Sequence, residues 1–328
     1  MTDLFNKKKE KGLSILRASS SFVSGEEISR ELSVSRAAVW KYIEALRKDG
    51  YEIEGISNQG YLLKSSPDEL LPTEIRPLLP KDYQGDIYFH DELASTNDEA
   101  RRLVQKGAPK GSLVIANRQK GGRGRRGREW QSPAGGIWFS LILRPDIPLL
   151  LAPRVSVFTV VIVAEAISAS IDHEASIKWP NDIFIKNRKV SGILIELSAE
   201  LDRVSYMVIG IGINANMRGD ELSGDVKDSA TTLMDEVGKK IDRKALVASI
   251  ATRYYKELDR VFTDRYQDYL ERWRKHSLIL EREVSIKEDG KETIGKALDI
   301  SENGALIVEL TDGTKKVFES GEVSLRIR

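Results

Sequence analysis

Apolar residues recur at helical spacing near the start of this 328-residue chain. Val39, Ile43 and Leu46 are separated by four and three positions, which predicts a helix with one face against a core. Ser35 precedes this stretch as a candidate N-cap, and Gly50 follows it as a stop signal. The pattern therefore predicts a helix of about three turns between these two residues.

A second, shorter helix is expected just before it. Ser24 and Glu27 form a capping-box pattern at its start, and a tight turn over residues 32–35 joins the two helices in helix-turn-helix order. YEIEGISNQGYLL then gives two short strand-like runs around a turn at residues 57–60, which is typical of a wing.

This winged helix-turn-helix order favours DNA binding by the outward part of the second helix. Small side chains there allow a close approach to the major groove, and cations can meet phosphates. The expected DNA-contacting residues are Ser35, Arg36, Ala37, Trp40 and Lys41. The alternative is a small helical domain with a solvated face. Eleven cations against nine anions up to Lys64 leave a net charge of only +2, which does not decide between the two.

Alternating strand and helix patterns follow, and a loop rich in arginine interrupts them. Apolar runs at residues 113–116 and 137–143 predict two strands, and GGRGRRGREW between them holds four arginines and four glycines. Ordering such a loop costs roughly 1 to 2 kcal/mol per residue. An anionic ligand such as phosphate offsets this cost through arginine and glycine N–H groups. The alternative is a flexible RNA-binding arm, but such arms usually lie in long disordered tails.

Polar residues gather at three further points of the same region. Ser95 and Thr96 precede a predicted helix, where they are either simple caps or offer hydroxyl and N–H groups to a ligand. KWPND and RKVSG place Lys178, Asp182 and Lys189 beside apolar strands, and GIGINAN ends another strand in polar residues. A meander with polar ends would explain this pattern too. However, lysines beside buried strands need partners, so we expect a site for a negatively charged transition state.

Composition narrows the class of protein. Hydrophobic residues make up 41% and charged residues 31% of the chain, which is typical of a soluble globular protein, and cysteine is absent. A thiolate zinc site, a disulfide and a cysteine nucleophile are thus excluded. His90, His173 and His276 show no metal-ligand spacing, so no protein metal site is expected.

The apolar runs of this chain meet neither the requirement for a membrane protein nor that for a secreted one. The basic N-terminus lacks the apolar run of a secretory signal. The apolar stretch from Val155 is about half the length that spans a bilayer. We therefore expect a cytoplasmic protein without a membrane partner. A proline-rich stretch from Pro67 is expected to be a linker, and EDG, ENG and TDG punctuate short strands near the end. The expected domains are residues 1–65, 66–275 and 276–328.

Taken in order, these motifs resemble those of biotin–protein ligases. STN at residues 95–97, Gln119 followed by GRGRRGREW, KWPND, RKVSGILIE and GIGINAN match across nearly the whole chain. SRAAVWKYIEALRKDGYEI and GYLL match the form of the family that also represses biotin genes. The resemblance implies an α+β multidomain protein: a winged helix-turn-helix, a central mixed sheet like that of class II aminoacyl-tRNA synthetases, and a C-terminal SH3-like β-barrel.

The resemblance also implies a reaction and its partners. A biotin–[acetyl-CoA-carboxylase] ligase joins biotin to ATP, with Mg²⁺, to give biotinyl-5′-AMP and pyrophosphate. It then acylates a lysine of biotin carboxyl carrier protein. The repressor form binds operator DNA as a homodimer that biotinyl-5′-AMP promotes.

Site residues follow from the matching motifs. Those implied to bind biotin are Ser95, Thr96, Asn97, Gln119, Arg123, Gly124, Arg125 and Lys189. Those implied to act in catalysis are Lys189, Arg125, Lys178 and Asp182, and those on the nucleotide side are Arg126, Asn181 and Asn214. One departure stands out. A tryptophan that stacks on adenine in a family member is missing here, because no aromatic residue lies between Tyr206 and Tyr254. Ala230, Thr231 and Thr232 are the candidates to pack the adenine instead.

Two other functions remain open at this point. A lipoate–protein ligase shares the adenylating chemistry, although the arginine loop and KWPND argue against it. A transcription factor that only senses a ligand would not need the intact loop and Lys189.

Overall fold

The computed structural model describes residues 2–226, 229–288 and 290–325. The chain divides into two compact units, residues 1–69 and residues 70–328. Each unit has its own buried core, and the ligase motifs all fall in the second.

The first unit is a winged helix-turn-helix domain. Its helices are α1 (Thr2–Arg17), α2 (Gly25–Leu32) and α3 (Arg36–Lys48), and strands β1 (Glu52–Ile56) and β2 (Gly60–Ser65) form the antiparallel wing. Ser24 and Ser35 cap α2 and α3, each accepting a hydrogen bond from the backbone three residues on. Helix α1 was not foreseen as a separate element. Its buried Leu13 and Leu16 complete the small core.

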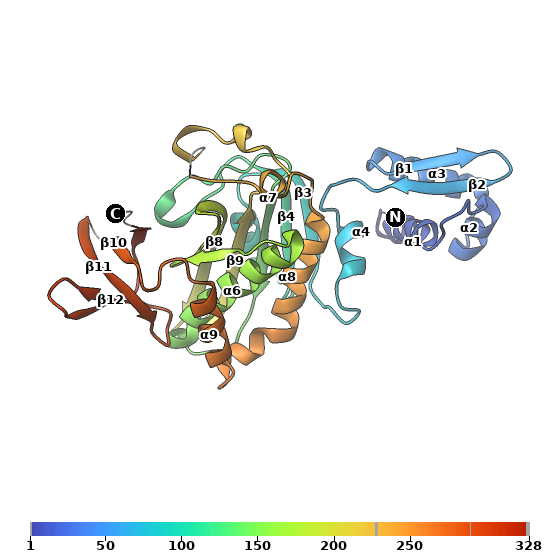
Figure 1. The fold of residues 1–328 in the computed structure, drawn as a ribbon. Coiled ribbons are helices and arrows are strands. Elements are labelled where there is room, and N and C mark those ends of the chain that lie inside the picture. Colours follow the sequence, from blue (N-terminus) through green and yellow to red (C-terminus); the bar gives the residue numbers. More distant parts are fainter. Residues whose placement is uncertain (1, 227–228, 289, 326–328) are drawn as a thin grey trace. The chain divides into compact units, whose positions relative to one another are not determined.

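A seven-stranded mixed sheet forms the centre of the second unit (Figure 1). Its order is β3-β4-β5-β9-β8-β7-β6; β3 and β4 are parallel and the other neighbours antiparallel. The strands are β3 (Ile87–Leu93), β4 (Leu113–Gln119), β5 (Ile137–Leu143), β6 (Ser176–Lys178), β7 (Asp182–Ile185), β8 (Arg188–Glu200) and β9 (Arg203–Ile213). The helices are α4 (Pro72–Ile75), α5 (Thr96–Gln105), α6 (Ala152–Ile171), α7 (Leu233–Val237), α8 (Arg243–Glu257) and α9 (Tyr266–His276).

Successive side chains along each strand point to opposite faces of this sheet. On β5, Phe139 and Leu141 join the main core, which is covered by α6, α8 and α9 (Figure 1). Ile142 points the other way and packs with Ala100 and Leu103 of α5. Because α5 covers only part of this second face, the remainder is open for a cavity.

Two expectations from the sequence need correction. The proline-rich stretch is not a free linker, since Leu70, Ile75 and Leu79 are buried in the main core around α4. The apolar helix is also longer than the stretch from Val155. The segment Leu149–Ile171 is long and apolar enough to cross a membrane by length and composition, but 67% of its most apolar window is buried inside the protein. This burial is typical of a core helix.

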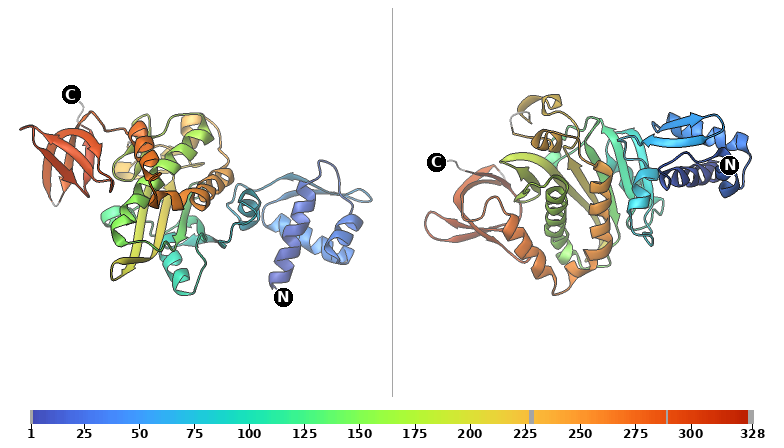
Figure 2. Two further views of the ribbon diagram at one scale, coloured as in Figure 1. Left: turned by 90° about the horizontal axis from the view of Figure 1, so that it is seen from below. Right: turned by 45° about the vertical axis from the view of Figure 1, so that its right-hand side comes forward.

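The C-terminal part is a five-stranded antiparallel sheet (Figure 2). Its order is β13-β12-β11-β10-β14, and its strands are β10 (Glu283–Glu288), β11 (Lys291–Ile300), β12 (Leu306–Leu310), β13 (Lys315–Phe318) and β14 (Glu322–Leu325). Among the bonds that join it to the central part, two involve β11 and the turn after it. Trp179 Nε1 donates to Gly304 O at 2.9 Å, and Arg274 Nε donates to Asp299 at 2.7 Å. The predicted order of a helix-turn-helix, a mixed sheet with helices and a small β-domain is confirmed.

Candidate active site

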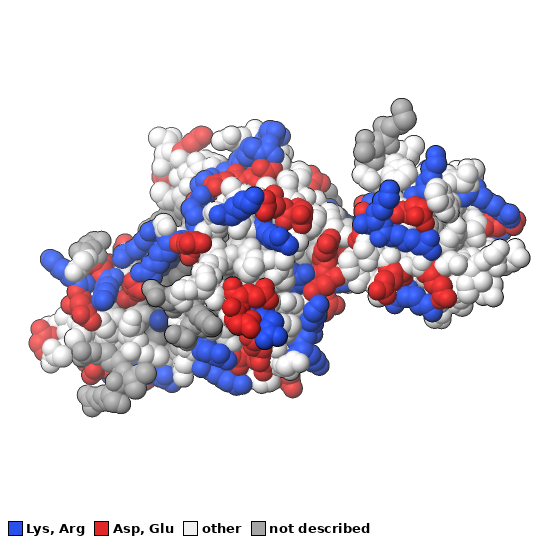
Figure 3. Space-filling model, turned by 90° about the horizontal axis from the view of Figure 1, so that it is seen from above, with Lys and Arg blue, Asp and Glu red and all other residues white. Residues whose placement is uncertain are grey.

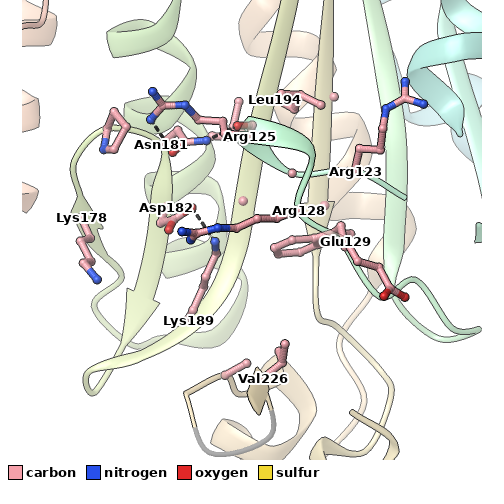
Figure 4. Close-up of a pocket in the computed structure, with 18 of the residues that line it drawn as sticks. Arg123, Arg125, Arg128, Glu129, Lys178, Asn181, Asp182, Lys189, Leu194 and Val226 are labelled. Carbon is pink, nitrogen blue, oxygen red and sulfur yellow. Dashed lines mark hydrogen bonds and ion pairs between the residues drawn. The ribbon is translucent and has the colours of Figure 1, made fainter. Parts of the chain in front are cut away.

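A cavity of about 630 Å³ lies on the open face of the central sheet (Figure 4). Every residue expected to bind biotin, to act in catalysis or to lie on the nucleotide side lines it, although these residues come from segments more than a hundred positions apart. They are Ser95, Thr96, Asn97, Gln119, Arg123, Gly124, Arg125, Arg126, Lys178, Asn181, Asp182, Lys189 and Asn214. The structure thus brings the expected residues together, and their individual roles remain predictions.

Three glycines make the floor of the cavity. On β9, a Cβ atom at Gly210 would come within 2.3 Å of Asn97 Oδ1, and one at Gly212 within 2.5 Å of Trp130 Nε1. On β8, a Cβ at Gly192 would come within 2.9 Å of the Trp130 ring. Real Cβ atoms do not approach other heavy atoms this closely, so any larger residue would displace Asn97 or Trp130.

The start of α5 forms one end of the cavity. Ser95 is its N-cap, and the N–H of Thr96 donates to Gln119 Oε1 at 2.8 Å. Ser140 Oγ lies 2.6 Å from Asn97 Oδ1 and 2.8 Å from the Thr96 hydroxyl. Asn97 Nδ2 in turn donates to Glu196 at 2.7 Å. These bonds fix several buried donors and acceptors at one end, which a small polar ring can use.

Cations gather at the opposite end. Lys189 Nζ lies 2.7 Å from Asp182 Oδ1, and Arg125 Nη1 donates weakly to Asn181 Oδ1 at 3.5 Å (Figure 4). Burial lowers the pKa of Arg125 and the pKa of Lys178, against the opposing effect of Asp182. A lowered pKa here means that the cationic form lacks solvation. An anionic ligand would restore that stabilisation.

The arginine loop lies over this end as a closed hairpin. Gly124 N donates to Arg128 O at 2.7 Å, and Trp130 N donates to Gly122 O at 2.9 Å. Gly122 has no space for a side chain, because a Cβ there would lie 2.4 Å from Trp130 O. Arg126 makes the turn with a φ of 57°. Glycine and one strained arginine thus allow the loop to fold back tightly.

Trp130 is a site residue that the sequence reasoning left out. Its ring covers Gly192 and Gly212, and Lys189 Nζ lies 5.2 Å from its centre. Its buried Nε1 has no hydrogen-bond partner in the part of the chain that the structure describes. A buried unpaired N–H is costly unless a ligand accepts from it. Its place at the end of an arginine–glycine loop was the available signal. For Ser140, the signal was one polar residue in an otherwise apolar strand.

The segment after β9 closes the cavity beside Lys189. Residues 229–231 pair with that lysine, whose N–H donates to Ser229 O and whose carbonyl accepts from Thr231 N. Of the three residues expected to pack adenine, only Ala230 lines the cavity. Thr231 is buried and donates to Glu236, and Thr232 is buried as the N-cap of α7. The expectation for these two threonines was therefore wrong. The Thr231 hydroxyl donates to Glu236 of α7, and the Thr232 hydroxyl accepts from the N–H of Asp235 in the same helix.

The side chains of the cavity bear on how a metal ion could bind. Within the described residues, no group of three or more histidine, aspartate or glutamate side chains could hold an ion. Asp182, beside Lys189, offers one carboxylate group to a metal ion. Mg²⁺ typically keeps several waters and uses one or two carboxylates together with substrate phosphates. The side chains present therefore fit a metal that arrives on a polyphosphate.

The expected DNA-contacting residues lie in the first unit. Ser35 and the first turns of α3 expose all five side chains, and Trp40 is 55% exposed. Arg36 pairs with Glu26 at 2.5 Å, with both side chains solvated. Charges of both signs are interspersed over the visible face of the molecule (Figure 3). The evidence for DNA binding is the helix geometry together with the exposure of these five side chains.

Three family models match the chain. They are the biotin/lipoate A/B protein ligase family at residues 91–214, an HTH domain at 8–62 and the biotin protein ligase C-terminal domain at 279–326. The bifunctional ligase/repressor BirA of Bacillus subtilis is 40% identical over 93% of this chain and 94% of its own length. That of Escherichia coli is 32% identical over 95% of both chains.

A solved structure agrees with these sequence matches. The biotin protein ligase of Aquifex aeolicus, solved in complex with biotin and ATP, has a TM-score of 0.63 and 34% identity. The match covers 74% of this chain and 98% of that one. With these likenesses, the helix-turn-helix unit and the cavity, the chain belongs to the family of bifunctional biotin–protein ligases and biotin repressors.

Proposed function

We propose that the cavity binds biotin and ATP side by side and joins them into biotinyl-5′-AMP. The observation that carries this proposal is the convergence of Lys178, Lys189 and Arg125 at one end of a cavity whose other end offers fixed neutral donors and acceptors. Biotin has a polar ureido ring at one end and a carboxylate at the other. The cavity matches this arrangement, with neutral hydrogen-bonding groups at one end and cations at the other.

The ureido ring lies against the start of α5 in this proposal. Ser95, Thr96, Asn97 and Gln119 supply its hydrogen bonds, and the glycine floor with Trp130 gives the apolar ring a flat wall. The carboxylate then points toward Lys189. Membership of the biotin ligase family and the names of its relatives decide against the lipoate alternative.

Adenylation brings two anions together. A carboxylate oxygen of biotin attacks the α-phosphorus of ATP, and pyrophosphate leaves. Lys189, held at 2.7 Å by Asp182, reaches the forming bond. Arg125 and Lys178 reduce the repulsion between the two anions. Arg126, Asn181 and Asn214 serve the nucleotide side. Mg²⁺ would accompany the phosphates and screen their charge, and Asp182 could supply a carboxylate ligand to it.

Transfer completes the reaction. The amine of a carrier-protein lysine attacks the acyl carbon of the adenylate, forming an amide and releasing AMP. The protein needs no covalent nucleophile of its own, in agreement with the absence of cysteine. Arg123, Gly124 and Arg125 belong to the loop that covers the adenylate and excludes water, which would otherwise hydrolyse the mixed anhydride. A biotin carboxyl carrier protein in the cytoplasm is the proposed acceptor.

The first unit makes the enzyme a repressor in this proposal. Each of the three expected domains has one role: residues 1–65 bind DNA, residues 66–275 carry out ligation, and residues 276–328 support the ligase site. One winged helix offers limited contact, so two copies reading two half-sites are expected. Biotinyl-5′-AMP promotes the pairing, because a loop already ordered by ligand need not be ordered by dimerisation.

An exposed leucine patch supports pairing through the second unit. Leu150 is 72% and Leu201 101% exposed, and Leu149 beside them is 39% exposed. The backbone joins the two segments, since Leu149 N donates to Asp202 O at 2.7 Å. Contiguous exposed apolar surface is typical of an association site. We propose that this leucine patch (Leu149, Leu150 and Leu201) contacts a second copy of the chain.

The first prediction concerns Lys189. Lys189→Gln is expected to slow formation of biotinyl-5′-AMP roughly a hundredfold while weakening biotin binding much less, because its charge acts mainly on the transition state. Rapid-quench kinetics with labelled ATP measures this rate. Lys186→Gln, a change of the same kind in the preceding turn, is the control and should leave the rate unaltered. An adenylation rate close to that of the wild type for Lys189→Gln would remove this lysine from the mechanism.

The second prediction concerns DNA. Lys41→Gln is expected to weaken binding to the promoter region of the organism's biotin genes and to lower the salt slope by about one ion, since one phosphate contact is lost. Lys48→Gln makes the same charge change at the other end of α3 and should have a smaller effect. Binding is measured by fluorescence anisotropy over a salt series. Equal slopes for the two variants would mean that Lys41 does not meet a phosphate.

The third prediction concerns pairing. Leu150→Asp is expected to suppress the dimer that biotinyl-5′-AMP promotes, while adenylate formation continues. Sedimentation velocity with and without the ligand measures the equilibrium. Leu78→Asp, at another exposed leucine of the same unit, is the control. Dimers formed equally well by both variants would show that the leucine patch is not the contact.

A further inference from the structure

The arginines of the loop do not all face the cavity. Arg123 donates twice to Asp98 of α5, at 2.7 and 2.5 Å. Arg128 pairs with Glu322 of β14. Arg125 instead points to Asn181 in the cavity wall, and its pKa is lowered by burial (Figure 4). The loop therefore has an ion pair near each end and a partly desolvated arginine between them.

Asp98 connects the arginine loop to the central sheet through hydrogen bonds with two arginines. It accepts from Arg101 as well as from Arg123, and Arg101 also donates to Glu196 of β8 at 2.8 Å. Glu196 is the carboxylate that accepts from Asn97. A continuous chain of bonds thus runs from Asn97 on the cavity floor to Arg123 in the loop.

We propose that Asp98 and Arg123 are positioning residues that hold the arginine loop closed against α5, so that Arg125 stays over the cavity. The inference rests on the proposed function for the identity of the ligand, and the ion pair acts on the closed form of the loop that this ligand orders. The inference adds to the proposed function by giving two arginines different roles. Arg123 fastens the loop, and Arg125 contacts the bound anion.

Electrostatics gives the pair its effect. Four arginines within six residues repel one another, which favours an open loop. A bidentate carboxylate neutralises one of them in a fixed geometry. Hydrogen bonding to Arg123 holds the pKa of Asp98 below its usual value, so the carboxylate stays charged at neutral pH. A part-exposed pair is weak in isolation. Asp98, however, is oriented by Arg101, and it therefore loses little freedom when it binds Arg123.

The side-chain direction separates this role from direct ligand contact. In Figure 4, Arg123 extends away from the group formed by Lys189, Asp182 and Arg125. Its guanidinium is occupied by Asp98, whereas Arg125 has no carboxylate partner among the described residues. Asp98 directly follows Asn97, so a ligand that orders the start of α5 also holds the residue that fastens the loop.

Limited proteolysis of the full chain with biotin and ATP present tests the proposal, because trypsin cleaves after arginine and the closed loop must open to enter its active site. Asp98→Asn is expected to raise the rate of cleavage within residues 123–128 roughly fivefold. Glu99→Gln removes the neighbouring carboxylate of the same helix turn, whose partner is Arg102, and should leave cleavage unaltered. The sites are identified by mass spectrometry.

Two further measurements exclude a general loss of structure. Adding Asp98→Asn to Arg123→Gln should not raise cleavage further, because the pair is already broken. With biotin and ATP present, Asp98→Asn should release biotinyl-5′-AMP into solution several-fold faster than the wild type. Cleavage of Asp98→Asn at the wild-type rate, or additive effects in the double variant, would overturn the proposal. Failure of the proposed function would appear differently, as a wild-type protein that forms no adenylate.

Discussion

The site depends on the absence of side chains at three positions of the central sheet. Gly192, Gly210 and Gly212 let Asn97 and Trp130 lie directly on β8 and β9, at distances that a Cβ atom would not allow. Asn97 brings the start of α5 to the sheet, and Trp130 brings the end of the arginine loop. Without this close approach, the neutral and cationic ends of the cavity would not face each other.

The second requirement is to keep cations together in a small volume before an anion arrives. The structure meets it with carboxylates placed at the margins: Asp182 beside Lys189, Asp98 beside Arg123 and Glu322 beside Arg128. Desolvation lowers the pKa values of Arg125 and Lys178, which are half-buried at this end of the cavity. Binding of an anion therefore relieves a cost that the folded chain already carries, which is how a preorganised site gains selectivity for charge.

Local signals in the sequence were sufficient for α2, α3 and the wing of the first unit, though not for α1, and for the position of the motifs. Caps at Ser24 and Ser35 and the period of Val39, Ile43 and Leu46 define a helix-turn-helix without tertiary information. The family motifs also located the residues that line the cavity. Pairings over long separations could not be predicted in this way. Nothing near Arg123 or Arg128 in the sequence identifies Asp98 or Glu322 as its partner.

Burial accounts for the remaining errors. The prolines after residue 66 resembled a linker, yet Leu70, Ile75 and Leu79 between them are core residues. Thr231 and Thr232 appeared available to a ligand, but their hydroxyls are used inside the fold. In both cases the local composition is typical of a surface segment. Packing against elements that are distant in the sequence buries these residues instead.

Substitution of Gly212 tests the central claim most directly. Gly212→Ala adds one Cβ atom that would lie 2.5 Å from Trp130 Nε1, so the indole must leave the floor of the cavity. The measurement is the affinity for biotinyl-5′-AMP by isothermal titration calorimetry, with circular dichroism as the check on folding. We expect a folded protein that binds the ligand roughly tenfold more weakly, a loss of about 1.4 kcal/mol. A folded Gly212→Ala protein with wild-type affinity would contradict it.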